Sequence, residues 1–436
     1  MEVGLARPRV PSFYALDIRR TTLGSLPIIE EFEIGAAQNS GAELAWLAPE
    51  HHEDAIDDIE FDLSVLRPLL TSDPEQVRGA GRYLLELSPD LGRSLRSRWA
   101  RWNQKKWSAT DGLCEATELM KAQLAQYGLT ARAYSPTALQ SFAACPYKFF
   151  LSAIHRLAPR EESLPLQMLD PLTRGSMYHS VLAQFFRHAL SKQMLPISPG
   201  NVAKACVVMD SLLEKTAADY YEQYAPAIER VWRDEVESIR SDLRGWLTQA
   251  AERPDGYVPD LIEFAFGLPL DQDRDPASTS KEAIPPEGFS LRGIVDLSER
   301  GENGEIRLTD HKTGKNRTEQ GMVVGKGEVL QPVLYSLAVE ALRKAPIKES
   351  RLSFCTAAGG YSERSVVVDQ QSREAGLRVL RTIDTSIRNC FLPPAPKENG
   401  CNWCEFASIC GPNEEIRMKR KASEPLEQLV QLRGMH

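Results

Sequence analysis

The stretch that decides the fold is residues 293–315, which reads GIVDLSERGENGEIRLTDHKTGK. A short apolar run at residues 293–297 carries one carboxylate, Asp296, and polar and apolar residues alternate over residues 306–312. The two runs flank a polar turn that contains glycine, so the pattern predicts a β-hairpin. Asp310 and Lys312 are two residues apart, and on a strand their side chains therefore point to the same face.

Two carboxylates and one ammonium group on one hairpin suit metal-assisted hydrolysis of a phosphodiester. Carboxylate oxygens of Asp296 and Asp310 are the ligands that Mg²⁺ prefers. A bound cation lowers the pKa of a water molecule, and Lys312 beside it can position that water or stabilise developing charge. The alternative interpretation is a surface hairpin with a cross-strand ion pair, because D-x-K is a common tripeptide.

Further motifs occur in a fixed order around this hairpin. Gly175-Ser176-Met177-Tyr178-His179 lies upstream, and Gln331-x-x-x-Tyr335 lies downstream of Asp310-x-Lys312-Thr313-Gly314. Together with Asp296 these motifs resemble the PD-(D/E)XK nucleases of the RecB and AddB type, from about residue 134 to residue 420. The apolar run at residues 261–270 contains Glu263, which resembles the acidic residue on the first strand of that family.

The resemblance implies roles for individual residues. It assigns Mg²⁺ or Mn²⁺ to His179, Asp296, Asp310 and the backbone carbonyl of His311. It makes Lys312 the residue that assists the attacking water. It also places Gln331 near DNA or the metal, and Tyr335 near a phosphate, although simple packing is an equal alternative for the tyrosine. The family usually has an aromatic or aliphatic residue where this chain has His311.

A second metal signal is the cysteine motif C-x2-C-x5-C formed by Cys401, Cys404 and Cys410. Three thiolates need a fourth ligand, and such sets bind zinc or a [4Fe–4S] cluster. In the AddB-like pattern the fourth ligand is Cys145, from a C-P-x-x-F segment, and the resemblance favours the [4Fe–4S] cluster over zinc. The cluster would then link the two ends of the nuclease domain and add to its folding free energy.

Composition sets broad limits on the protein class. The 436 residues carry a net charge of −8, which by itself does not indicate a nucleic-acid binder, although local basic patches can exist within an acidic total. We find no stretch apolar enough to span a bilayer and no apolar signal segment, so we expect a cytoplasmic protein with no membrane contact. We also find no G-x-x-x-x-G-K-[ST] loop, which argues against an ATP-driven motor.

The order of predicted elements divides the chain near residue 130. Residues 1–130 read as a helical region, in which residues 91–107 interleave arginines and lysines with three tryptophans. That helix suits a nucleic-acid backbone, or its tryptophans are core anchors. Residues 7–12 and 26–27 resemble the segment before the nuclease in AddB-like helicase–nucleases. Residues 131–436 then form the nuclease domain, with a mixed sheet flanked by helices as the family fold implies.

Inside the nuclease domain, the apolar patterns predict helices, strands and one flexible loop. The loop is residues 271–288, rich in Asp, Ser and Pro. Helices are expected over residues 171–192, 207–224, 227–251, 329–342 and 372–388. Strands beyond the hairpin are expected over residues 261–270, 351–356 and 365–369. In the N-terminal region, residues 74–86 and 111–127 also read as helices.

These observations predict a metal-dependent DNA nuclease, an exonuclease that acts in the repair or recombination of double-strand ends. The partners are expected to be DNA and a helicase, which is either a separate subunit or an upstream region lost from this chain. Two alternatives stay open: a catalytically silent, nuclease-like scaffold that binds DNA ends or a partner, and a regulator with a zinc ion or a cluster.

Overall fold

The chain forms two compact units, Met1–Lys105 and Lys106–His436. The computed structural model describes residues 13–24, 47–71, 75, 78–79, 81–158, 169–224, 226, 228–253, 256–271, 273–411 and 413–436. The segments at residues 7–12 and 26–27, which carry the resemblance to a pre-nuclease region, lie outside the described residues.

The first unit is helical where the structure describes it, as expected from the sequence. Its α-helices are α1 (Phe13–Leu23), α3 (Asp58–Thr71), α4 (Arg82–Leu87) and α5 (Pro89–Asn103). The helix expected over residues 74–86 is the short α4, joined to α3 by a hydrogen bond of 2.8 Å from the Tyr83 hydroxyl to Asp62. The basic helix α5 contains no buried residue, and Trp99 on it is 59% exposed, so this tryptophan is not a core anchor.

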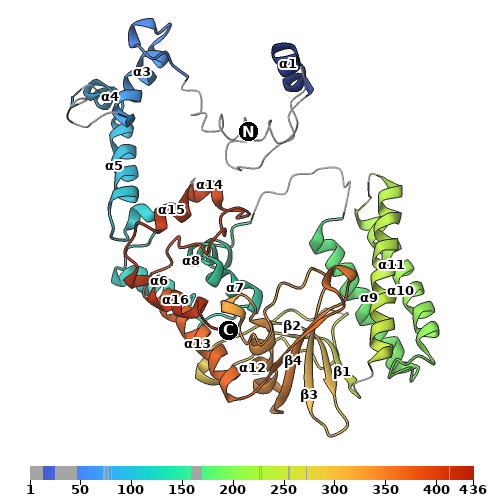
Figure 1. Cartoon of the computed structure of the whole chain (residues 1–436). Coiled ribbons are helices and arrows are strands. Elements are labelled where there is room, and N and C mark those ends of the chain that lie inside the picture. Colours follow the sequence, from blue (N-terminus) through green and yellow to red (C-terminus); the bar gives the residue numbers. More distant parts are fainter. Residues whose placement is uncertain are drawn as a thin grey trace. The chain divides into compact units, whose positions relative to one another are not determined.

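The second unit is built on a five-stranded mixed sheet with the strand order β1-β2-β3-β4-β5 (Figure 1). The predicted hairpin is β2 (Gly293–Arg300) and β3 (Ile306–Lys312), which pair antiparallel. The strand β1 (Val258–Phe266) pairs antiparallel with β2, and β4 (Ile347–Phe354) pairs parallel with β3. The edge strand β5 (Glu363–Val367) is antiparallel to β4. The parallel pair arises because a helix crosses over between β3 and β4.

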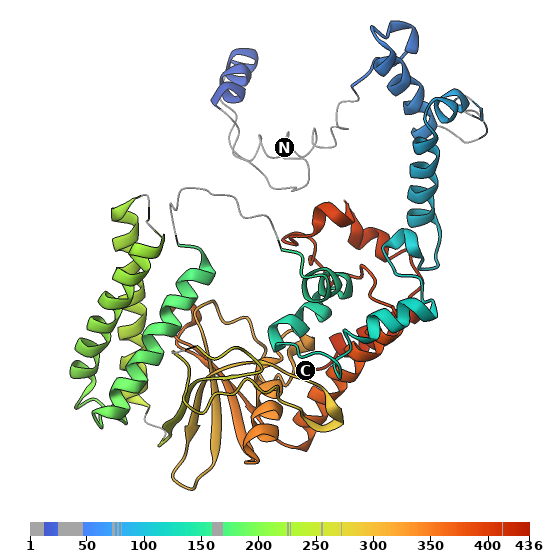
Figure 2. The same cartoon turned by 180° about the vertical axis from the view of Figure 1, so that it is seen from behind.

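Helices cover both faces of this sheet, and each face has its own core (Figures 1 and 2). On one face lie α12 (Gln331–Arg343) and α13 (Gln370–Arg388), with apolar residues of all these elements in one cluster. On the other face α9 (Pro171–Ser191) packs against β1, and α10 (Val202–Tyr224) packs on α9 and on α11 (Glu229–Glu252). Apolar residues of these three helices share one cluster with β1 and β2. This arrangement confirms the expected mixed sheet flanked by helices.

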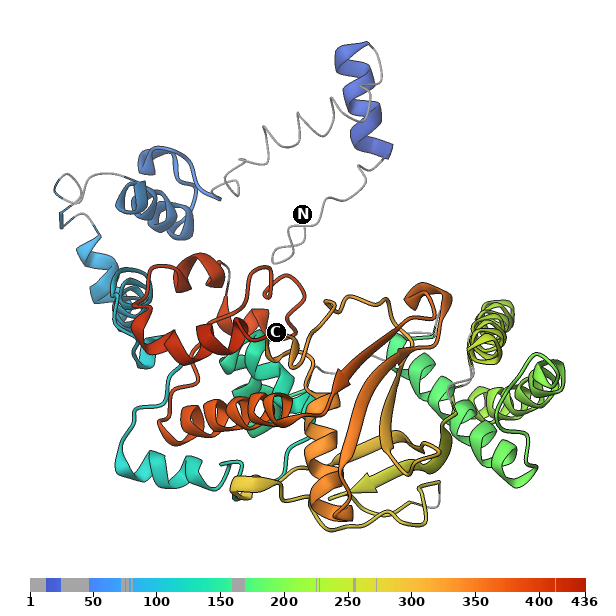
Figure 3. The same cartoon turned by 60° about the horizontal axis from the view of Figure 1, so that its bottom comes forward.

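The remaining elements of the second unit lie beside the face covered by α12 and α13. The cartoon turned about the horizontal axis shows the C-terminal helices together with the segment that precedes α9 (Figure 3). These elements are α6 (Glu118–Ala125), α7 (Pro136–Ala144), α8 (Pro146–Phe149), a π-helical turn (Phe150–Ile154), α14 (Ala407–Cys410), α15 (Glu414–Met418) and α16 (Glu427–Arg433). Among the described helices, none is long and apolar enough to cross a membrane.

Residues 106–130 pack with the second unit, whereas the sequence pattern predicted a boundary between two regions near residue 130. The Trp107 indole donates a hydrogen bond of 2.9 Å to the carbonyl of Ala422, and Asp111 forms buried ion pairs with Arg417 and Lys421. Leu124 also joins the core beneath α12 and α13. These contacts join residues far apart in the sequence, so local patterns cannot reveal them.

The loop after β1 is more ordered than its composition predicts. Thr279 donates its backbone N–H to the carbonyl of Ala265 at 2.9 Å, and Gly267 donates to the carbonyl of Thr279 at 3.1 Å. The loop therefore follows the outer edge of β1 where the sequence predicted a flexible segment.

Candidate metal-dependent active site

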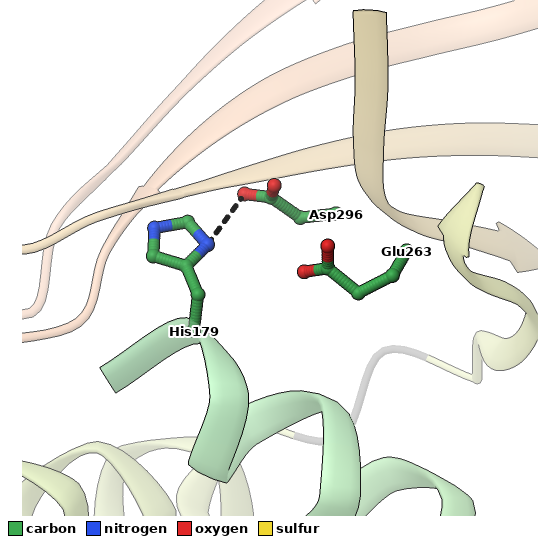
Figure 4. Close-up of side chains that lie close together, drawn as sticks. All are labelled: His179, Glu263 and Asp296. Atoms are coloured by element: carbon green, nitrogen blue, oxygen red, sulfur yellow. Dashed lines mark ion pairs between the residues drawn. The ribbon is translucent and has the colours of Figure 1, made fainter. Parts of the chain in front are cut away.

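Three side chains converge where α9 faces β1 and β2. His179, Glu263 and Asp296 each offer one ligand atom, and these atoms all lie within 4.8 Å of one another. Figure 4 shows the imidazole and the two carboxylates turned towards one another, and its dashed line marks the ion pair of 3.3 Å between His179 Nδ1 and Asp296 Oδ2. The three residues come from separate elements, so the tertiary fold creates this group.

The start of α9 fixes the position of His179. Asp170 caps the helix by accepting hydrogen bonds from the backbone N–H groups of Leu172 and Thr173, and Pro171 occupies the first turn. The adjacent Tyr178 is fully buried, and its hydroxyl donates a hydrogen bond to the carbonyl of Cys355. A fixed helix start and a buried neighbour leave His179 at the edge of the apolar stripe, facing the sheet.

Glu263 occupies an unusual backbone position on β1. The register aligns Ile262 with Leu297 and Phe264 with Val295, so Glu263 lies opposite Asp296. Its φ is 59°, in the left-handed region that non-glycine residues adopt rarely and at a free-energy cost. Strained backbone of this kind is concentrated at functional sites, and here it accompanies a buried carboxylate beside a second carboxylate.

Asp310 and Lys312 lie side by side, as the two-residue spacing on β3 predicted. Lys312 Nζ is 2.5 Å from Asp310 Oδ2 and donates a hydrogen bond of 2.7 Å to Gln331 Oε1. The amide of Gln331 donates in turn to Asp310 Oδ1 at 2.9 Å. Gln331 is the first residue of α12. The start of this helix therefore connects Asp310 with Lys312.

His311 and Tyr335 have mainly packing environments. The His311 ring is 3% exposed and stacks on Phe186 with ring centroids 6.0 Å apart, while its backbone N–H donates to Asp296 Oδ2 at 2.7 Å. Tyr335 is 7% exposed and packs edge-to-face against Phe266. The buried His311 imidazole nevertheless borders the group, with its Nδ1 3.8 Å from Asp296 Oδ2, whereas Tyr335 lies within the core.

Burial and neighbouring charges together shift the pKa values of the group. Burial opposes charge on His179, but Asp296, together with Asp310 and Glu263, outweighs burial and raises the pKa of His179 to about 9. Burial and the neighbouring Asp296 raise the pKa of Glu263 to about 7. Burial raises the pKa of Asp310 to about 6, although Lys312 acts in the opposite direction. Protons are therefore retained where carboxylates are crowded.

The donor set fits a hard divalent cation. Carboxylate oxygens and one imidazole surround a single point, and such ligands suit Mg²⁺ or Mn²⁺. Asp310 Oδ2 is buried without a hydrogen bond despite the nearby Lys312, so one polar atom beside the group lacks a geometrically satisfactory partner. A cavity of about 880 Å³ opens onto His179, Glu263, Asp296 and Lys312, which leaves space for a substrate.

The cysteines of the second motif line another cavity of about 500 Å³, together with Cys145. Cys145 ends α7, and the Lys148–Glu405 ion pair of 2.8 Å joins the following helix to the cysteine loop. Burial raises the pKa of Cys401 to about 12, with Glu415 and then Cys145 acting in the same direction. The four cysteines thus share one cavity although they lie far apart in the sequence.

Sequence reasoning recognised Glu263 only through resemblance and did not include it among the metal ligands. The structure places it directly in the group with His179 and Asp296, whereas Asp310 lies beside that group, paired with Lys312. Residue 263 is neither glycine nor asparagine, so its residue type does not indicate a left-handed backbone. The only sequence feature that indicates a functional role for Glu263 is an acidic residue inside an apolar strand.

Comparison with known proteins identifies one family. Residues 133–411 match the model of the PD-(D/E)XK nuclease superfamily. No curated protein sequence matches the chain. A solved structure titled "Crystal structure of SSO0001" shares 14% identity, covering 54% of this chain and 97% of that chain, with a TM-score of 0.24.

Proposed function

The chain belongs to the PD-(D/E)XK nuclease superfamily, and from this premise we propose that it is a Mg²⁺- or Mn²⁺-dependent deoxyribonuclease. The observation that carries the proposal is the convergence of His179, Glu263 and Asp296 beside the Asp310–Lys312 pair. A surface hairpin with an ordinary ion pair would not need a histidine and a strained glutamate from two other elements. Membership of the superfamily supports the hydrolysis of phosphodiesters by this chain. The carboxylates and the imidazole of the site support the dependence of that reaction on a divalent cation.

Each residue of the site has a distinct task in this proposal. His179, Glu263, Asp296 and Asp310 would hold the cation, which when bound activates water and neutralises charge on the scissile phosphate. The backbone carbonyl of His311 is proposed as a further ligand. Lys312 would orient the attacking water or stabilise the developing negative charge, because its ammonium group is already directed by Asp310 and Gln331.

Gln331 and Tyr335 are proposed to act at the edge of this site. The amide of Gln331 forms hydrogen bonds with both Asp310 and Lys312. These bonds support a role for Gln331 in fixing the positions of the carboxylate and the ammonium group. Tyr335 lies one helical turn later, and its buried ring supports the start of α12 more directly than it could reach a phosphate.

We further propose that Cys145, Cys401, Cys404 and Cys410 bind a [4Fe–4S] cluster. A single zinc ion with Zn–S bonds of roughly 2.3 Å brings its four sulfur atoms to within about 3.8 Å of one another. In the described part of the chain, the cysteines do not form a group of three ligand atoms within 4.8 Å. All four cysteines line one cavity, which supports a shared site for a thiolate-bound group, and the resemblance to AddB-like nucleases favours the cluster.

The proposed biological role is exonucleolytic processing of DNA ends during repair or recombination in the cytoplasm. A helicase partner would supply the unwinding, since the sequence contains no phosphate-binding loop of the Walker type. The RecB- and AddB-type motifs quoted above are the support for this role.

The deciding experiment is cleavage of end-labelled linear DNA by the purified chain. We expect products in Mg²⁺ or Mn²⁺ and none in EDTA, and mononucleotides or short fragments from the labelled end would identify an exonuclease. An intact chain that binds Mn²⁺ and leaves single- and double-stranded DNA uncut would refute the nuclease proposal.

A further inference from the structure

Arg274, from the loop after β1, forms an ion pair with one ligand of the candidate metal site. Its Nη1 donates a hydrogen bond of 2.8 Å to Glu263 Oε2. The side chain of Arg274 is 26% exposed and that of Glu263 is 14% exposed, and both line the 880 Å³ cavity. The more exposed arginine thus pairs with a less exposed carboxylate of the same cavity.

The loop that carries Arg274 is held in place by other contacts. The Asp275 carboxylate accepts hydrogen bonds of 2.8 Å from the backbone N–H groups of Ile262 and Ala277. Arg187 on α9 donates to the backbone carbonyl of Asp273 at 2.7 Å. These contacts lie on both sides of Arg274 in the sequence, so its guanidinium can leave Glu263 without releasing the loop.

Charge balance makes it unfavourable for Arg274 and a metal ion to share Glu263. The carboxylates of Glu263, Asp296 and Asp310 carry three negative charges when ionised. With His179 bound to the metal as a neutral imidazole, a divalent cation and the ammonium group of Lys312 together balance those three charges. The guanidinium of Arg274 would then be an additional positive charge close to the metal and repelled by it. A phosphate oxygen in the cavity is a suitable alternative partner, because arginine binds phosphate with directional, charge-assisted hydrogen bonds.

We propose that Arg274 competes with the divalent cation for Glu263 and, once displaced, binds a phosphate of the DNA substrate. Arg274 is then a substrate-binding residue that couples the arrival of the metal to the capture of DNA. The inference rests on the nuclease function proposed above. It assigns to one side chain two effects of opposite sign: Arg274 weakens metal binding and strengthens DNA binding.

Two binding measurements on the full chain test this inference without relying on cleavage. In the first, Mn²⁺ is titrated calorimetrically into the wild type and into Arg274→Gln, which keeps a hydrogen-bond donor but removes the charge. We expect the variant to bind Mn²⁺ roughly fivefold or more tightly, because a competing cation is gone. In the second, a fluorescein-labelled single-stranded oligonucleotide is titrated in Ca²⁺, another cation that prefers oxygen ligands. We expect roughly tenfold weaker DNA binding by the variant.

Matched variants separate this role from a structural one. Arg274→Lys keeps the charge and should recover most of the DNA affinity. Arg300→Gln removes another arginine that pairs with a β1 carboxylate, Asp260, and should leave both affinities within about twofold of wild type. Thermal unfolding of every variant, monitored by circular dichroism, checks that the fold is kept.

Several outcomes would overturn the inference. Weaker or unchanged Mn²⁺ binding by Arg274→Gln would refute competition, and unchanged DNA binding would refute the phosphate contact. Because both readouts are equilibrium affinities, they remain decisive even if the wild type cleaves no DNA. That result would refute the proposed nuclease function separately.

Discussion

Replacing Glu263 by glutamine should stabilise the protein at alkaline pH in the absence of divalent cations. Burial and Asp296 raise the pKa of this carboxyl from 4.5 to about 7, so the folded state resists its ionisation. The free energy of unfolding of the wild type therefore falls as the pH rises from 4.5 to about 7. The full loss, at about 1.36 kcal/mol per pKa unit, is about 3 kcal/mol. Glutamine has a similar shape and no charge, and it removes this loss.

The magnitude depends on pH in a defined way. At pH 8 the variant should exceed the wild type by up to about 3 kcal/mol, whereas at pH 5 the difference should shrink to below about 1 kcal/mol. For a unit of this size, the alkaline difference corresponds to a rise in melting temperature of roughly 3–6 °C. Adding Mn²⁺ should raise the melting temperature of the wild type and have much less effect on the variant, because a ligand has been lost.

The assay is thermal and urea-induced unfolding in EDTA at the two pH values, followed by the same scans in Mn²⁺. Asp260→Asn is the control, since Asp260 is a β1 carboxylate paired with an arginine outside the site, and its effect should stay below about 1 kcal/mol. A Glu263→Gln variant that is less stable than the wild type in EDTA at pH 8 would refute the reasoning from burial and charge repulsion.

Three other predictions concern activity, the cysteine site and the C-terminal packing. Asp310→Ala and Lys312→Ala should each lower the cleavage rate of labelled DNA by at least roughly a hundredfold with an unchanged circular dichroism spectrum; near-wild-type rates in both would end the nuclease interpretation. Cys404→Ser should lose iron and sulfide in chemical analysis and unfold at a lower temperature, whereas a colourless wild type with one bound zinc would refute the cluster. Asp111→Ala should lower the free energy of unfolding in urea by roughly 3–5 kcal/mol, because Arg417 loses a buried partner; a change below about 1 kcal/mol would contradict this.

The hairpin at the centre of the second unit could be predicted from local patterns alone. Alternating residues around a glycine-containing turn indicated β2 and β3, and the two-residue spacing placed Asp310 beside Lys312. The pattern does not show where Asp296 lies along its strand, and the structure places it within β2. Local alternation encodes which face of a strand a residue occupies, and it encodes strand ends only weakly.

The complete site could not be derived from local patterns, because its ligands come from separate elements. His179 and Glu263 approach Asp296 only after α9 packs on the sheet, and the resemblance to a family, not periodicity, pointed to the histidine. The left-handed backbone at Glu263 has no signal in the sequence, since glutamate is not a residue that favours it. The same limit applies to Cys145, which reaches the cysteine loop through tertiary contacts.

Two buried clusters on the same sheet differ in how the charge of their acids is balanced. Glu299 is 6% exposed, and burial alone would raise its pKa, but Arg351 and Arg307 outweigh burial and lower it. Asp310 is equally buried and Glu263 is largely buried, yet their pKa values are raised. Burial is therefore not the difference between the clusters. Two arginines compensate the acid of one cluster, whereas in the other Asp296 adds to the effect of burial on Glu263 and Asp310. The pKa of Asp296 itself is lowered, because His179 outweighs its burial. A divalent cation at the proposed site would add positive charge beside these carboxylates, so the free energy that the fold loses by gathering them would contribute to the affinity and position of the metal.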